Sequence, residues 1–88
     1  MSTKEKESSA TGVDTPELRK LILFNSSHLW DEVIIQLQKA TGFDVLQCEQ
    51  IAIIAHTKGK ATVKSGGYGE LSRINSVLRE INLITEIK

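Results

Sequence analysis

The chain has 88 residues, of which 40% are hydrophobic and 25% charged, as in one ordinary globular domain. Eleven basic and eleven acidic residues give a formal net charge of zero, which argues against a nucleic-acid binder because such proteins carry a basic excess. The single cysteine, Cys48, excludes an internal disulfide and a cysteine-rich zinc site, and no apolar run approaches the roughly 20 residues of a membrane span. We therefore expect a cytoplasmic protein that holds no metal or other cofactor.

Residues 1–16 consist mostly of Lys, Glu, Ser, Thr and Gly, and they lack the apolar segment of a secretory signal. We expect this tail to be disordered or loosely attached, and residues 17–88 to form the folded domain. Pro16 closes the tail. The nearly continuous apolar run from Leu18 to Phe24 predicts a short strand in the centre of a sheet.

The polar residues 25–27, Asn-Ser-Ser, are typical of turns and of helix N-caps. Apolar residues then recur at spacings of three and four from Leu29 to about Thr41, which predicts a helix. Asp31 and Glu32 favour its positive end, and Gly42 is suited to the position after its last turn.

Asp44 begins a second predicted helix, because Gln47 three residues later completes a capping-box arrangement. This helix is expected to end at Lys58-Gly59. Its apolar face is formed by residues spaced three and four apart and broadened by Ile54; these are Cys48, Ile51, Ala52 and Ala55.

The remaining residues predict a strand at 61–64, a glycine-rich loop at 65–69, a helix that begins at Glu70 and a last strand at 82–88. The third helix has an apolar face made of Leu71, Ile74, Val77, Leu78 and Ile81. The last strand places Leu83, Thr85 and Ile87 on one side, with Ile84 and Glu86 on the other. The order β-α-α-β-α-β indicates an α+β fold with a three-stranded sheet and all helices on one face, and the pattern leaves the strand directions open.

Four stretches carry a resemblance to the ClpS family, the adaptors that bring N-degron substrates to ClpA or ClpC unfoldases. They are "ILFNSS", "LQKATGFD", "AHTKGKATV" and "GELSRINSVLREINL" within Leu18 to Lys88. The family has an Asn-Asp-Asp-x-Thr-Pro-Met motif before its first helix. Its second helix ends in an apolar residue, His, two further residues, Gly and a basic residue, as residues 55–60 do here. The resemblance implies an antiparallel sheet backed by three helices and a monomeric, non-enzymatic adaptor.

The resemblance also implies a pocket that captures the N-terminal residue of a substrate protein through its free ammonium group. The implied ligands of that group are Asn25 and His56, with Ser26 and Ser27 at the positions of the two family acids. An Asn carbonyl oxygen and the lone pair of a neutral imidazole are both acceptors for an ammonium group. The implied apolar wall for a bulky hydrophobic side chain comprises Val33, Ala52, Ala55 and Leu83, and Trp30 stands where the family has a methionine at the pocket edge.

A second implied surface binds the N-terminal domain of the unfoldase. Glu70 matches a family acid there, and Asn75 stands in the place of a family lysine. Because both serines lack the family's negative charge, the alternative is a divergent paralogue that keeps the fold but regulates Clp, or binds another ligand, without recognising N-degrons.

The residues alone also allow plainer roles. Residues 25–27 can simply turn the chain and cap the first helix, His56 can neutralise the last carbonyl groups of the second helix, and Glu70 can be a first-turn acid. Cys48 and His56 do not form a nucleophile and base, because eight residues of helix separate them by about 12 Å.

Overall fold

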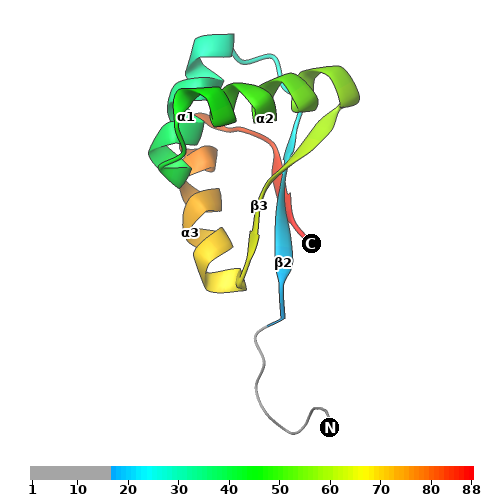
Figure 1. Cartoon of the computed structure of the whole chain (residues 1–88), viewed down its shortest axis with the longest axis vertical. Coiled ribbons are helices and arrows are strands. Elements are labelled where there is room, and N and C mark those ends of the chain that lie inside the picture. Colours follow the sequence, from blue (N-terminus) through cyan, green and yellow to red (C-terminus); the bar gives the residue numbers. More distant parts are fainter. Residues whose placement is uncertain (1–16) are drawn as a thin grey trace, which may run out of the picture.

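The computed structural model describes residues 17–88, and the predicted disordered tail, residues 1–16, lies outside the described residues. The elements are β2 (Arg19–Phe24), α1 (Trp30–Thr41), α2 (Val45–Lys58), β3 (Lys60–Gly66), α3 (Tyr68–Leu78), the short 3-10 helix η1 (Arg79–Ile81) and β4 (Thr85–Ile87). The strands form one sheet in the order β3-β2-β4, and β2 is antiparallel to both neighbours (Figure 1). The α+β fold with the order β-α-α-β-α-β is confirmed, as is the central place of the first strand.

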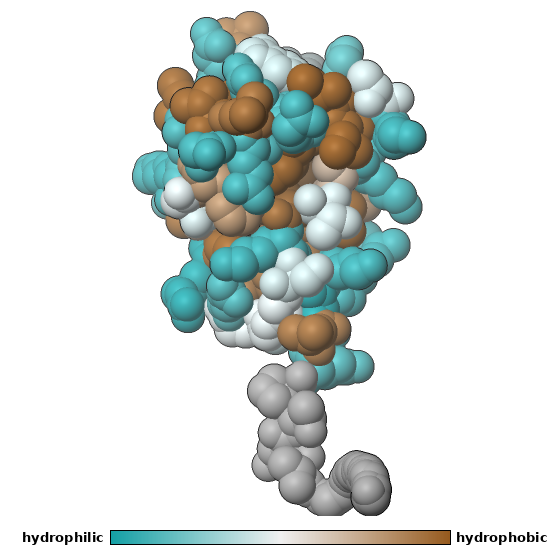
Figure 2. Space-filling model, viewed as in Figure 1, coloured by the Kyte–Doolittle hydropathy of each residue, from teal (hydrophilic) through white to brown (hydrophobic). Residues whose placement is uncertain are grey.

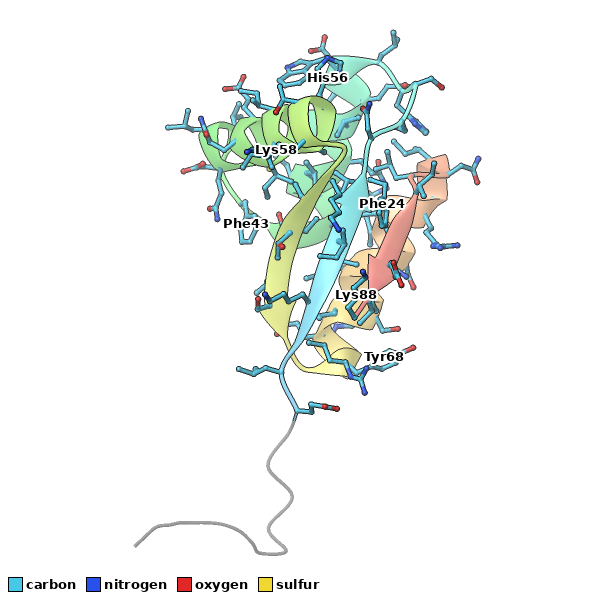
Figure 3. All side chains as sticks on the ribbon, turned by 90° about the vertical axis from the view of Figure 1, so that its right-hand side faces the viewer. Phe24, Phe43, His56, Lys58, Tyr68 and Lys88 are labelled. Carbon is cyan, nitrogen blue, oxygen red and sulfur yellow. The ribbon has the colours of Figure 1, made fainter. Side chains whose placement is uncertain are left out.

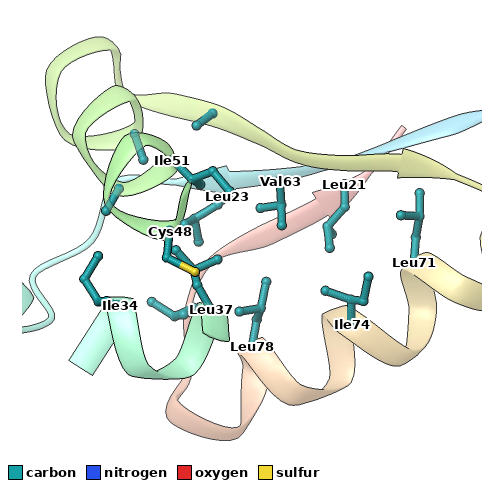
Figure 4. Packing of buried hydrophobic residues seen from close by; sticks show 14 residues of the cluster. Leu21, Leu23, Ile34, Leu37, Cys48, Ile51, Val63, Leu71, Ile74 and Leu78 are labelled. Carbon is teal, nitrogen blue, oxygen red and sulfur yellow. The ribbon is translucent and has the colours of Figure 1, made fainter. Parts of the chain in front are cut away.

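One hydrophobic core joins the sheet to all three helices (Figure 4). Leu21 and Leu23 of β2 and Val63 of β3 contribute from the sheet, and the helices contribute Ile34, Leu37, Cys48, Ile51, Ala52, Ala55, Leu71, Ile74 and Leu78. Cys48 is fully buried, as expected of a small apolar residue on the inner face of its helix.

The first two helices differ in how their N-termini are capped. The Asp44 side chain accepts a hydrogen bond from the Gln47 N–H at 2.8 Å, which confirms the predicted start of α2. Helix α1 instead begins after Leu29, whose N–H donates to Glu32 Oε1 at 3.1 Å, and no side chain from residues 25–27 caps it. The plain role of those residues as a helix cap is therefore wrong.

Ile54 does not belong to the buried face of α2. It is 40% exposed, because at 3.6 residues per turn its side chain points away from the centre of the face formed by Cys48, Ile51, Ala52 and Ala55. Figure 2 shows hydrophobic residues on the surface where α1 and α2 lie, and the exposed ones in these two helices are Trp30, Ile35, Val45, Leu46, Ile53 and Ile54.

The predicted loop at 65–69 is almost entirely taken up by regular structure. Ser65 and Gly66 continue β3 because they pair with Lys20 and Arg19 of β2. Helix α3 starts at Tyr68, two residues before the predicted start at Glu70, so the connection shrinks to Gly67.

The last strand is shorter than predicted. Asn82 has a left-handed backbone, with φ at 63°, and it ends the η1 turn before β4 begins. The predicted alternation is confirmed, because Leu83 and Thr85 are buried while Ile84 and Glu86 are exposed. Among residues 17–88, no helix is long and apolar enough to cross a bilayer.

Candidate functional site

The end of β2 and the end of α2 are tied together by the backbone. Asn25 follows β2, and its N–H donates to the carbonyl oxygen of Gly59 at 3.0 Å. Gly59 ends α2 in a left-handed conformation with φ at 90°, which lets the chain turn directly into β3 beside β2. Asn25 is thereby held close to the last turn of α2, which carries His56, although 31 residues separate the two in the sequence.

At this junction lies a cavity of about 240 Å³. It is lined by Leu23, Phe24, Asn25, Ser26, Ser27, His28, Trp30, Val33, Ala52, Ala55, His56 and Leu83. All nine residues expected at the amine site and the apolar wall therefore line one cavity. Their roles toward a ligand stay predictions.

The cavity combines an apolar wall with a polar segment. Ala52, Ala55 and Leu83 are nearly inaccessible at 5%, 4% and 3% exposure, so they form a preformed, tightly packed surface. The polar segment, residues 25–28, follows β2, and Asn25 in it is exposed. His56 on α2 is exposed as well (Figure 3). A pocket with a mainly apolar lining and a few polar groups in fixed places is typical of ligand-binding sites.

Three lining residues were missed by the sequence reasoning. Phe24 could have been found because it directly precedes the polar segment. Leu23 could have been found because it points to the same buried side of β2 as Leu21, and it lies at the end of the strand nearest the polar segment. No local sequence pattern indicated that His28 would line the cavity. Its Nδ1 lies 2.8 Å from Ser26 Oγ, and its Nε2 contacts the carbonyl oxygen of Ile81 in η1, 53 residues away.

The two residues expected to dock an unfoldase do not line the cavity. Glu70 lies in the first turn of α3 and forms an ion pair with Lys64 at 2.6 Å between Oε2 and Nζ. The hydrogen bond and the positive charge of Lys64 lower the pKa of the Glu70 carboxyl. Asn75 is partly buried, and its Oδ1 accepts a hydrogen bond from the Thr85 hydroxyl, so it helps to hold α3 against β4.

Neither metal binding nor thiol chemistry finds support in the described part of the chain. No three His, Cys, Asp or Glu side chains among residues 17–88 gather into a metal site. Burial raises the pKa of the Cys48 thiol; a hydrogen bond with Thr41 opposes this effect only in part, and the nearby Asp44 charge, the smallest of the three influences, raises the pKa further. A buried thiol with a raised pKa is a packing residue.

Comparison with known proteins gives one family and one well-matched fold. The sequence profile of the family "ATP-dependent Clp protease adaptor protein ClpS" matches residues 14–82. The structure of Agrobacterium tumefaciens ClpS2 bound to L-phenylalaninamide is similar, with a TM-score of 0.72, 18% sequence identity and coverage of 84% of this chain and 100% of that chain. At this identity the structural likeness shows the fold alone. No curated protein sequence matches the chain.

Proposed function

Because this chain belongs to the ClpS family of Clp protease adaptors, we propose that its cavity binds the bulky hydrophobic N-terminal residue of a substrate protein. The domain then delivers that protein to a Clp unfoldase-protease in the cytoplasm and performs no chemistry itself. The observation that carries this proposal is the convergence of Asn25, His56 and an apolar wall on one cavity.

The ammonium group is the feature that distinguishes an N-terminal residue from every internal one. Asn25 offers a carbonyl oxygen and neutral His56 offers one ring nitrogen, and both are exposed to the cavity. Ser26 and Ser27 line the same cavity and add hydroxyl oxygens. Each hydrogen bond to a charged group contributes about 1.5–3 kcal/mol, so two or three acceptors are enough to favour a free amine over an acetylated one.

The size of the cavity fits one large apolar side chain. An apolar cavity of about 150 Å³ suffices for benzene in another protein, and the cavity here measures about 240 Å³. The ligand bound in the similar Agrobacterium structure, L-phenylalaninamide, combines a free amino group with a benzyl side chain. Those are the two chemical features that this cavity is arranged to accept.

Two features at the cavity set its strength and selectivity. Ser26 and Ser27 are uncharged, so each contact they make to an ammonium group is worth about 1 kcal/mol less than a carboxylate contact. Trp30 lines the cavity at 44% exposure, and its ring can stack on an aromatic guest. We therefore expect weaker binding than in a pocket with two acids, and a preference for aromatic first residues.

The first turn of α3 is the proposed docking surface for the N-terminal domain of a ClpA- or ClpC-type unfoldase. Glu70 is held there by Lys64, with 42% of its side chain exposed. Asn75, which bonds Thr85 inside the fold, contributes by keeping α3 in place. In a pull-down with that unfoldase domain, Glu70→Arg should abolish capture, whereas Glu86→Arg on β4 should not; equal capture by the two variants would rule this surface out.

The test of substrate binding is calorimetric titration with a Phe-initiated peptide and its N-acetylated twin. Asn25→Ala and His56→Ala should each weaken binding of the free-amine peptide about tenfold or more. Gln50→Ala, which removes an exposed amide outside the cavity on α2, should change nothing. Equal binding of the two peptides would contradict capture through the amine and would favour the divergent paralogue without N-degron recognition.

A further inference from the structure

His28 occupies a place in the polar segment that neither a turn nor a helix cap requires. It lines the cavity and is partly buried between Ser26 on one side and η1 on the other. Its two ring nitrogens have different partners, a hydroxyl group at Nδ1 and a backbone carbonyl oxygen at Nε2. That asymmetry determines how the protons are arranged.

The Ile81 carbonyl oxygen can only accept, so the His28 Nε2 must carry a proton and donate it. In the neutral ring, Nδ1 is then the unprotonated nitrogen and can only accept. The Ser26 hydroxyl, 2.8 Å away, therefore donates its proton to Nδ1. Because this proton points at His28, the Ser26 oxygen presents only its lone pairs to the cavity that it lines.

We propose that His28 is a positioning residue that makes Ser26 an obligate acceptor for the ammonium group of the substrate. This inference rests on the proposed function. A free serine hydroxyl group can rotate so that its hydrogen points at the ammonium group, and the two then repel each other. The hydrogen bond to His28 prevents this orientation. Donation to Nδ1 also polarises the Ser26 oxygen and strengthens it as an acceptor, since linked hydrogen bonds reinforce one another. The linked hydrogen bonds of Ser26, His28 and Ile81 thus give the ammonium group a fixed acceptor without a negative charge, which is part of what a carboxylate would supply.

Two substitutions of His28 separate this role from a purely structural one. In His28→Asn, the amide oxygen lies at the level of Nδ1, so Ser26 keeps an acceptor while the contact with Ile81 is lost. In His28→Gln, the longer amide reaches the Ile81 carbonyl oxygen, so the tether is kept while the Nδ1 acceptor is lost. A structural role predicts that the Gln variant is the milder one, and the proposed role predicts the opposite.

The experiment measures the affinity of a Phe-initiated peptide for the full chain and its variants, with thermal melts to show that each is folded. Ser26→Ala and His28→Gln should each weaken binding about fivefold. The double variant should be no weaker than either single one, because both changes remove the same acceptor. His28→Asn should bind within about twofold of the wild type.

Nitrogen NMR of the histidine rings in the wild-type chain gives a test that needs no variant. It should show His28 with a protonated Nε2 and an unprotonated Nδ1. The Nδ1-protonated tautomer, or His28→Gln binding as tightly as the wild type, would overturn the inference while leaving the proposed function intact. A wild-type chain that ignores the free-amine peptide would refute the proposed function, and this inference with it.

Discussion

Filling the cavity from within gives a quantitative test of the apolar wall. Ala52 lies on α2, is 5% exposed and lines the cavity. In Ala52→Phe the new ring needs the space of a benzene molecule, about 150 Å³, and the cavity has about 240 Å³. The remainder is too small for a second large side chain, so the first residue of a peptide must stay in water.

Full burial of a Leu or Phe side chain contributes about 1.5–3 kcal/mol, so excluding it should weaken binding of a Leu-initiated peptide about tenfold to a hundredfold. The single tryptophan, Trp30, lines the same cavity and serves as a fluorescence probe for the titration. An Ala-initiated peptide should lose much less, and Gln50→Phe, on the exposed side of α2, should bind like the wild type. A folded Ala52→Phe variant with unchanged affinity for the Leu-initiated peptide would refute the assignment of this cavity to the side chain.

Two further outcomes follow from the structure. Gly59→Ala should lower the unfolding free energy by about 1–2 kcal/mol, because the backbone φ at this position is 90°. Gly67→Ala should change the unfolding free energy far less, because φ there is −75° and the added methyl group meets open space. Equal denaturant midpoints for the two variants would contradict the argument from backbone strain. Cys48 should react with a thiol reagent only as fast as the protein unfolds, because it is buried and its pKa is raised, and rapid labelling of the native chain would contradict its role in the core.

The sequence predicted the fold because its local signals agree with the packing. The continuous apolar run of β2 reflects burial at the centre of the sheet, and the Asp44 cap and the inward face of α2 follow from spacing alone. The errors lie where long-range pairing decides. Gly66 reads as a loop residue, but pairing with Arg19 extends the strand to it.

The candidate site was predictable only through the family resemblance. The sequence spacing did not reveal that Asn25 and His56 share a cavity. They are brought together by a long-range backbone hydrogen bond, in which the Asn25 N–H donates to the Gly59 carbonyl oxygen. His28 shows the same limit, since the carbonyl group that orients its ring belongs to Ile81 in a different part of the chain. Contacts of this kind carry no local pattern, so they become visible only in three dimensions.

The most direct test of amine capture is NMR shift mapping of the wild-type chain with a Phe-initiated peptide and its N-acetylated twin. We expect the free-amine peptide to shift the signals of Asn25 and His56 together with those of the cavity wall, including Ala52 and Ala55. The acetylated peptide should leave Asn25 and His56 unchanged. Identical shifts with the two peptides, or no shifts with either, would contradict the account.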